Sequence, residues 1–210
     1  MNDFASTAMD SAIPGGTRGD TTTRALPLPL HFAMHAATLV VAWSLLAAAD
    51  SWTVISELGV AKLLAIITGA LAGGLFVATM HEWGHLIGAR MGKADITISS
   101  KPGIILYHWH FPFNSVPQFM AMSVCGTAGG LLGLLLLFVQ LPADTAGRIA
   151  VLAAAAGFSA FAATLEWPII WRTQTSREPS KEYAKITPTI LKASAAVGFV
   201  VGTLTFLALG

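Results

Sequence analysis

Long apolar runs separated by short polar segments dominate this sequence. Five of these runs approach or exceed the roughly 20 residues that an α-helix needs to cross a hydrocarbon layer of about 30 Å. Charged residues lie almost entirely between the runs. The pattern predicts an all-α integral membrane protein with spans at about residues 28–49, 62–90, 117–141, 148–171 and 188–209.

Two segments depart from this pattern. Residues 1–25 are rich in Gly, Ser, Thr and Asp and lack the layout of a cleaved signal peptide, so we expect a disordered cytoplasmic tail before a single membrane domain over residues 26–210. Residues 94–113 alternate apolar and polar positions around Pro102-Gly103, which predicts a small membrane-associated β-hairpin at the cytoplasmic face. Because lipid does not satisfy irregular backbone, a hairpin here implies a polar cavity nearby.

Composition and charge agree with a membrane protein. Only 11% of the residues are charged, against about 25% in an ordinary soluble domain. The net charge of +1 and the scattered Lys and Arg exclude a nucleic-acid-binding surface. Lys and Arg gather before the first predicted span and after the second and fourth, which predicts a cytoplasmic N-terminus and a multi-pass protein of the cell (inner) membrane.

A His-Glu-x-x-His motif, His81-Glu82-Trp83-Gly84-His85, lies inside the second predicted span. In a helix the two histidines share one face, where both imidazoles can bind one Zn²⁺. Glu82 lies beside them, where its carboxylate can accept a proton from water as a catalytic base. An ionisable group inside the bilayer costs about 2.5–3.5 kcal/mol, and metal binding is a physical reason to place three of them there.

Glu166, in the fourth predicted span, offers a third ligand. With a rise of about 1.5 Å per residue, the motif lies roughly 10 Å inside Arg90, and Glu166 lies roughly 9 Å inside Arg172. Both depths are measured from the cytoplasmic side, so the two sites are predicted at matching depth on neighbouring helices. Glu166 is then either a zinc ligand or a lone carboxyl that is protonated and hydrogen-bonded within the bundle.

The run HEWGHLIGAR resembles the HExGHxxxAR signature of the site-2 protease family of intramembrane zinc metallopeptidases. In that family the signature is followed by a hairpin, a Pro-led span with an Ala-Gly-Pro-x-x-Asn element, and a span ending in Leu-Asp-Gly whose Asp is the third zinc ligand. The counterparts here are residues 96–111, 115–133 and 164–170, with Leu165-Glu166 in place of Leu-Asp. The resemblance covers a core of about residues 60–172 and implies an active site near the cytoplasmic side.

This sequence departs from the family pattern at three points. Glu166 replaces Asp, Trp167-Pro168 replaces two small residues, and the segment Gly126–Gly130 has no Asn. Glu remains a competent zinc ligand, whereas substrate positioning by the absent Asn does not carry over. The resemblance therefore implies a divergent, minimal member, with an inactive homologue left open.

Four further histidines require an interpretation. His31 and His35 share one helix face and are either a second metal pair or bundle-facing polar residues. His108 and His110 alternate on the predicted strand, so both point the same way. They either face the active-site cavity, where they contact substrate or oxyanion, or lie at the interface; Asn114 is a further candidate for the same role.

The expected function is zinc-dependent hydrolysis of a peptide bond in a transmembrane protein substrate within the lipid bilayer. Zn²⁺ is held by His81, His85 and Glu166, with Glu82 as catalytic base. The altered elements around Glu166 favour an alternative, a non-proteolytic subunit that serves as an assembly or regulatory partner of a membrane complex. A di-iron desaturase or hydroxylase ranks last, because its histidine boxes need more than the six histidines present.

Overall fold

The computed structural model describes residues 25–210, so the tail predicted for residues 1–25 lies outside the described part except for its last residue. Five helices in that part are long and apolar enough to cross a membrane: α2 (Leu28–Ser56), α3 (Gly59–Met91), α4 (Val116–Gln140), α5 (Ala146–Ser176) and α7 (Pro188–Leu209). The remaining elements are the strands β1 (Ile96–Ile98) and β2 (Tyr107–Trp109), the 3₁₀ turn η2 (Phe111–Phe113) and the short helix α6 (Pro179–Tyr183). The predicted fold, five long helices with one small hairpin, is confirmed.

Several helices are longer than the apolar runs that predicted them. The helix α2 continues to Ser56, seven residues past the predicted end. Asp50 does not end it, because the Asp50 carboxylate accepts a hydrogen bond of 2.8 Å from the Thr145 hydroxyl at the start of α5. The 33 residues of α3 extend for about 50 Å, which exceeds a hydrocarbon core of about 30 Å.

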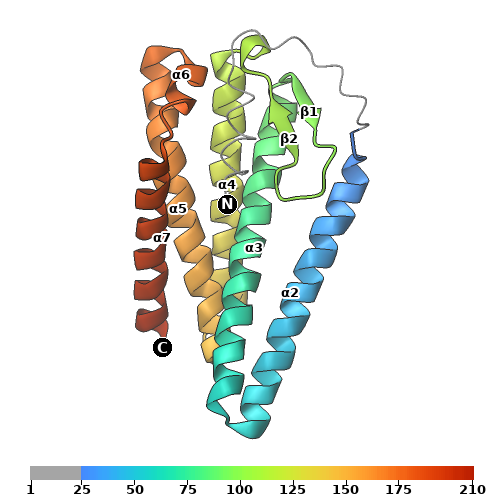
Figure 1. Cartoon of the computed structure of the whole chain (residues 1–210), viewed down its shortest axis with the longest axis vertical. Coiled ribbons are helices and arrows are strands. Elements are labelled where there is room, and N and C mark those ends of the chain that lie inside the picture. Colours follow the sequence, from blue (N-terminus) through green and yellow to red (C-terminus); the bar gives the residue numbers. More distant parts are fainter. Residues whose placement is uncertain (1–24) are drawn as a thin grey trace.

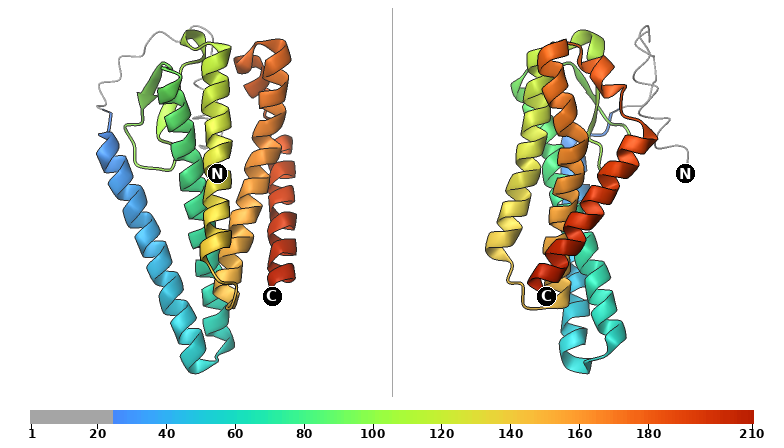
Figure 2. Two further views of the ribbon diagram at one scale, coloured as in Figure 1. Left: turned by 180° about the vertical axis from the view of Figure 1, so that it is seen from behind. Right: turned by 90° about the vertical axis from the view of Figure 1, so that its left-hand side faces the viewer.

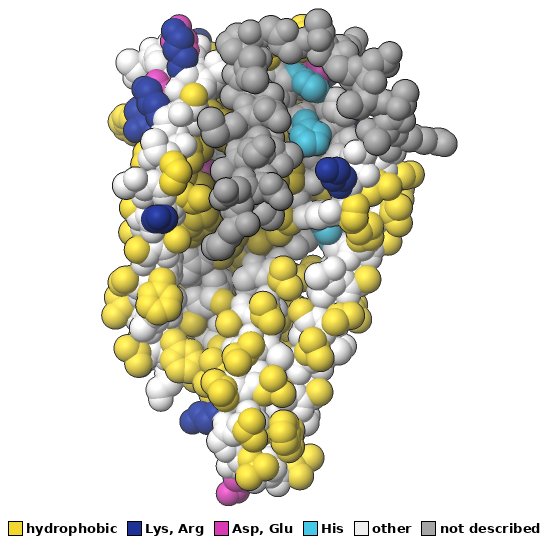
Figure 3. All heavy atoms as spheres, in the orientation of Figure 1, with side chains coloured by type: hydrophobic (Ala, Val, Ile, Leu, Met, Phe, Trp, Pro, Cys, Tyr) yellow, Lys and Arg dark blue, Asp and Glu magenta, His cyan; other side chains and the backbone are white. Residues whose placement is uncertain are grey.

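The helix α3 forms the centre of the bundle and packs against α2, α4 and α5, while α7 covers the outer side of α5. Figure 2 shows that α2 and α3 converge at their connecting turn and diverge toward the opposite end. The hairpin lies in the space between them at that opposite end (Figure 1). In the space-filling view, hydrophobic side chains cover the helices, and most Lys and Arg lie toward the end that carries α6 (Figure 3).

Glycines bring α3 and α5 into backbone contact. A Cβ added to Gly69 would collide with the Gly147 carbonyl, and one added to Gly73 would collide with the Val151 carbonyl. Between membrane helices, where lipid removes the hydrophobic driving force, such close approach is the main source of packing energy. Small-residue packing at these positions therefore sets how closely α3 and α5, the second and fourth predicted spans, can align their polar groups.

Two histidines of α2 tether the hairpin. His31 donates from Nε2 to the Ser99 carbonyl at 3.1 Å, and His35 donates from Nε2 to the Gly103 carbonyl at 2.9 Å. Trp83 of the motif donates its indole N–H to His35 Nδ1 at 3.0 Å, so both ring nitrogens of His35 are engaged. These contacts satisfy loop carbonyls that lipid would leave unpaired, in agreement with the bundle-facing interpretation of the two residues.

Replacing Gly73 with Ala is expected to destabilise the bundle, because the new methyl group meets the Val151 carbonyl and forces α3 away from α5. Overpacking of this kind costs about 1–3 kcal/mol. Gly74→Ala is the matched control, since its Cβ would meet nothing within 4 Å. Thermal unfolding of the two purified variants measures the difference, and equal unfolding temperatures would contradict the proposed backbone contact.

Candidate metal centre

His81 and His85 of α3 and Glu166 of α5 converge on one point. His81 Nε2 lies 2.9 Å from Glu166 Oε1, His85 Nε2 lies 3.2 Å from the same oxygen, and the two Nε2 atoms are 2.9 Å apart. Their side chains are 5%, 12% and 24% exposed, so all three are largely removed from solvent. The structure thus brings together the three residues that the sequence nominated as ligands, from two helices at one depth.

The three atoms fit a tetrahedral metal site. Bonds of about 2.0–2.1 Å to Zn²⁺ imply ligand separations of about 3.3 Å, and the observed separations of 2.9, 2.9 and 3.2 Å lie within a few tenths of this value. The second oxygen of Glu166, Oε2, is buried and has no hydrogen-bond partner within residues 25–210. Two nitrogens and a carboxylate are a donor set that Zn²⁺ accepts, so the residues present fit this metal.

The orientation of His85 is fixed by its second nitrogen. His85 Nδ1 lies 3.0 Å from the Met122 carbonyl of α4. A carbonyl only accepts, so Nδ1 carries the proton and Nε2 turns its lone pair toward Glu166 and His81. Histidines that ligate metals commonly donate their other N–H in this way, which fixes the tautomer and the ring plane.

Two glycines of α4 make room for the imidazoles. A Cβ on Gly126 would collide with the His85 ring, and a Cβ on Gly130 would lie 3.2 Å from His81 Nδ1. Their spacing relative to the motif histidines becomes informative only when α3 and α4 are placed side by side, so sequence reasoning missed their part in the site.

Glu82 remains free for chemistry. It adjoins His81 in the chain and lies in the electrostatic field of His85, His81 and Glu166. Its side chain is partly buried, and it forms no hydrogen bond or ion pair with any other residue in the part of the chain that the structure describes. The two carboxylates therefore differ in their contacts: Glu166 is engaged by both imidazoles, whereas Glu82 has no hydrogen-bond partner among the described residues.

The segment after Glu166 continues as helix. Pro168 lies inside α5 and removes one backbone hydrogen bond, because proline has no N–H to donate to the carbonyl of Thr164. Trp167 is half exposed on the outside of the bundle. The departure from two small residues is thus accommodated without ending the helix, and Glu166 lies ten residues before Ser176, the last residue of α5.

The hairpin presents Tyr107 to the metal centre. In β2 the side chains alternate, and Trp109, on the same face as Tyr107, packs against Phe119 of α4 with ring centroids 6.2 Å apart. Burial raises the pKa of the Tyr107 hydroxyl, and the nearby carboxylates of Glu82 and Glu166 raise it further. The sequence did not single out Tyr107; the period-2 alternation would have found it had the opposite face been chosen.

His108, His110 and Asn114 lie elsewhere. His108 is exposed and pairs with Thr97 of β1, and His110 Nε2 lies 2.8 Å from the Thr97 hydroxyl. They share one face, as expected, but it is the face opposite Tyr107. Asn114 donates to the Asp95 carbonyl and accepts from its N–H, which closes the base of the hairpin. The structure does not bring these three residues together with the metal cluster.

The short helix α6 packs against α5 and against the turn η2. The ring of Tyr183 in α6 packs against Phe111, with centroids 5.6 Å apart. Buried Glu182 anchors α6 through Arg172 at 3.1 Å and Lys185 at 2.7 Å. The hydrogen-bonded Lys185 ammonium lowers the pKa of the Glu182 carboxyl below its ordinary value, which keeps this anchor charged at neutral pH.

Comparisons with known proteins were made at three levels. No family model, no curated protein and no solved structure matches this chain. The class that the fold and site define is therefore stated from geometry: a bundle of five apolar helices with a buried cluster of two histidines and one glutamate that can hold a metal ion.

Gly126→Ala is expected to weaken metal binding strongly, because the added methyl group collides with the His85 ring and turns it away from His81 and Glu166. Loss of correctly oriented ligation costs about 10- to 100-fold in metal affinity. Gly130→Ala is the graded control, since the 3.2 Å approach to His81 Nδ1 requires only a small shift. Titration of purified protein with Co²⁺, followed by its visible absorption, measures both variants. Unchanged affinity in Gly126→Ala would contradict this packing role.

The two tyrosines of the chain are expected to stay protonated above the ordinary tyrosine pKa of about 10. Burial and the charges of Glu82 and Glu166 raise the pKa of Tyr107, and the same causes raise that of Tyr183. Phenolate absorbance near 295 nm should therefore appear at higher pH in folded protein than in denatured protein. Tyr183→Phe isolates the Tyr107 signal. If Tyr107 in the folded variant has the same pKa as in the denatured protein, the placement of Tyr107 near the two carboxylates is wrong.

Proposed function

We propose that this protein is a zinc metallopeptidase that hydrolyses a peptide bond of a transmembrane substrate, and that it is a divergent, minimal member of the site-2 protease family. The observation that carries the proposal is the convergence of His81, His85 and Glu166 within 3.2 Å of one another, with an unengaged Glu82 beside them. A metal-binding cluster without such a free carboxylate would suit a structural site. The free carboxylate favours hydrolysis.

His81, His85 and Glu166 would hold the metal. Bound Zn²⁺ supplies a Lewis acid that polarises the scissile carbonyl and makes water a stronger acid. Glu82 accepts the proton of the attacking water and then delivers it to the leaving amine, so one carboxylate serves both proton transfers. Gly126 and the Met122 carbonyl keep His85 in the orientation that this chemistry needs.

The substrate must reach the site in an extended form, because a helix hides its carbonyls in hydrogen bonds. The two-stranded sheet of β1 and β2 supports such a conformation, since each strand has one edge without a strand partner among the described residues. An added strand would be bound through main-chain hydrogen bonds. The inward face with Tyr107 and Trp109 directs the hairpin toward Glu82, which favours this route for the peptide.

Charge distribution supports the orientation that we propose for the protein in the cell (inner) membrane. Lys and Arg gather at the end of the bundle that carries the hairpin and α6, as Figure 3 shows for one face. Cytoplasmic segments are enriched in these residues. The N-terminus and the active site are then on the cytoplasmic side, and the turn between α2 and α3 faces the opposite side.

Glu82→Gln is expected to abolish peptide cleavage while the protein keeps its bound zinc, because Gln has the size of Glu but accepts no proton. Loss of a general base lowers the rate by about 10²- to 10⁴-fold. Glu57→Gln, in the turn at the far end of the bundle, is the matched control. The measurement combines zinc content with cleavage of a library of transmembrane peptides in liposomes.

A fully active Glu82→Gln protein would refute the proposed mechanism. Wild-type protein that holds one zinc ion yet cleaves no peptide of the library would refute proteolysis and favour the non-proteolytic membrane-complex subunit. If the purified protein binds no zinc, the proposed metal site is wrong. The three results are distinct, because zinc content and cleavage are measured on the same samples.

A further inference from the structure

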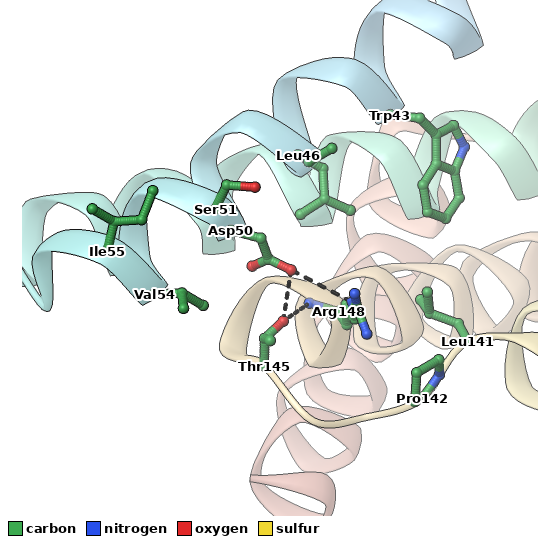
Figure 4. Close-up of a pocket in the computed structure, with 11 residues that line it drawn as sticks. Trp43, Leu46, Asp50, Ser51, Val54, Ile55, Leu141, Pro142, Thr145 and Arg148 are labelled. Atoms are coloured by element: carbon green, nitrogen blue, oxygen red, sulfur yellow. Dashed lines mark hydrogen bonds and ion pairs between the residues drawn. The ribbon is translucent and has the colours of Figure 1, made fainter.

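A groove of about 630 Å³ lies at the end of the bundle away from the metal centre. Figure 4 shows its two walls, the second half of α2 and the connection between α4 and α5. Trp43, Leu46, Leu141 and Pro142 give the walls their apolar character. A volume between about 300 and 1,000 Å³ is typical of sites for small molecules, so this groove is large enough for a specific ligand.

An ion-pair cluster lies at the edge of the groove: Asp50, Thr145 and Arg148 line the groove, and Asp144 lies beside this lining and pairs with Arg148. Asp50 accepts a hydrogen bond from the Thr145 hydroxyl at 2.8 Å and lies 3.6 Å from Arg148 Nε, as the dashed lines in Figure 4 mark. Arg148 also pairs with Asp144, with Arg148 Nη1 lying 2.9 Å from an oxygen of the Asp144 carboxylate. Two carboxylates and one guanidinium leave this cluster with a net charge of −1. The Asp144 carboxylate and the Arg148 guanidinium are the more exposed members, so they are the groups that a ligand can reach.

In a membrane whose hydrocarbon layer begins at Leu28, the cluster would lie at the depth of the lipid headgroups. Asp50 is 22 positions beyond Leu28, where α2 begins, which corresponds to about 33 Å along the helix. A hydrocarbon core is about 30 Å thick. Trp43 and Leu46 precede Asp50 on α2 and line the groove on the hydrocarbon side of the polar cluster, whereas Val54 and Ile55 line it beyond the cluster.

We infer that the groove binds one zwitterionic phospholipid whose headgroup carries a primary ammonium, as in phosphatidylethanolamine. The acyl chain lies along Trp43 and Leu46, the phosphate faces Arg148, and the ammonium extends past the edge of the groove to Asp144. An anionic headgroup is disfavoured by the net negative charge of the cluster. A choline headgroup has no N–H to donate to a carboxylate, whereas a primary ammonium has three.

Such a lipid would join two parts of the protein that otherwise meet at few points. The helix α2 packs chiefly against α3, and its polar contacts with α5 are those of Asp50 with Thr145 and Arg148. A phospholipid in the groove contacts α2 and the α4–α5 connection at once. It therefore stabilises the folded bundle in proportion to its occupancy.

The test uses the full-length purified protein in detergent, stripped of lipid and then supplied with phosphatidylethanolamine, phosphatidylcholine or phosphatidylglycerol of identical acyl chains. Native mass spectrometry counts retained lipids, and thermal unfolding reports stabilisation. We expect one retained phosphatidylethanolamine and a rise in the unfolding temperature that the other two lipids do not reproduce. Equal retention of the three lipids, or retention of none, would overturn the inference.

Two variants locate the lipid. Ala47→Phe places a ring in the groove and is expected to abolish retention, while Val40→Phe, on the same helix but outside the groove, is expected to leave it unchanged. Asp144→Asn removes one exposed carboxylate and is expected to reduce the preference for phosphatidylethanolamine over phosphatidylglycerol by about two- to fivefold, the effect of one exposed ion pair. Retention that is undiminished in Ala47→Phe, or lost equally in Val40→Phe, would place the lipid elsewhere.

Discussion

The mutual satisfaction of three ionisable side chains within an apolar bundle is the constraint on which the remaining structure depends. His81, His85 and Glu166 would each be costly in a low-dielectric environment, and they are tolerable only while their reactive atoms meet. Meeting requires that α3 and α5 lie in backbone contact, which Gly69 and Gly73 permit. It also requires space for two imidazoles between α3 and α4, which Gly126 and Gly130 of α4 provide. Packing and chemistry are therefore set by the same small residues.

A second constraint concerns the hairpin. Backbone groups that leave helical geometry at membrane depth need partners from the protein, and His31 and His35 supply donors to two carbonyls of the hairpin loop. The hairpin then presents one face to the bundle and the other outward. Its inward face carries aromatic side chains that pack against α4 and approach Glu82. A short sheet is thus stable here because helices complete both its hydrogen bonds and its packing.

Much of this arrangement could be predicted from the sequence, and there are physical reasons why the remaining features could not. Apolar length predicted the five helices, and helical rise brought Glu166 to the depth of the motif. The ends of α2 and α5 were misjudged because polar residues such as Asp50 find partners in other helices and do not end the helix. The hairpin was predicted, but both of its faces mix polar and aromatic residues, so alternation alone did not show that Tyr107 and not His108 faces inward. The role of Gly126 depends on which helix packs against α4, and no local sequence pattern predicts that.

The link from α2 through His35 to both Trp83 and Gly103 has a consequence for how this protein can change. One imidazole connects the helix that bears the metal motif, the hairpin loop and the first long helix, and each of its nitrogens has a fixed role as donor or acceptor. Substitution of His35 breaks both bonds, whereas substitution of Trp83 breaks one of them. A chimera in which another helix replaces α2 would therefore need a histidine at the position of His35 to keep both the hairpin loop and Trp83 bonded, although 68 residues separate His35 from Gly103 in the chain.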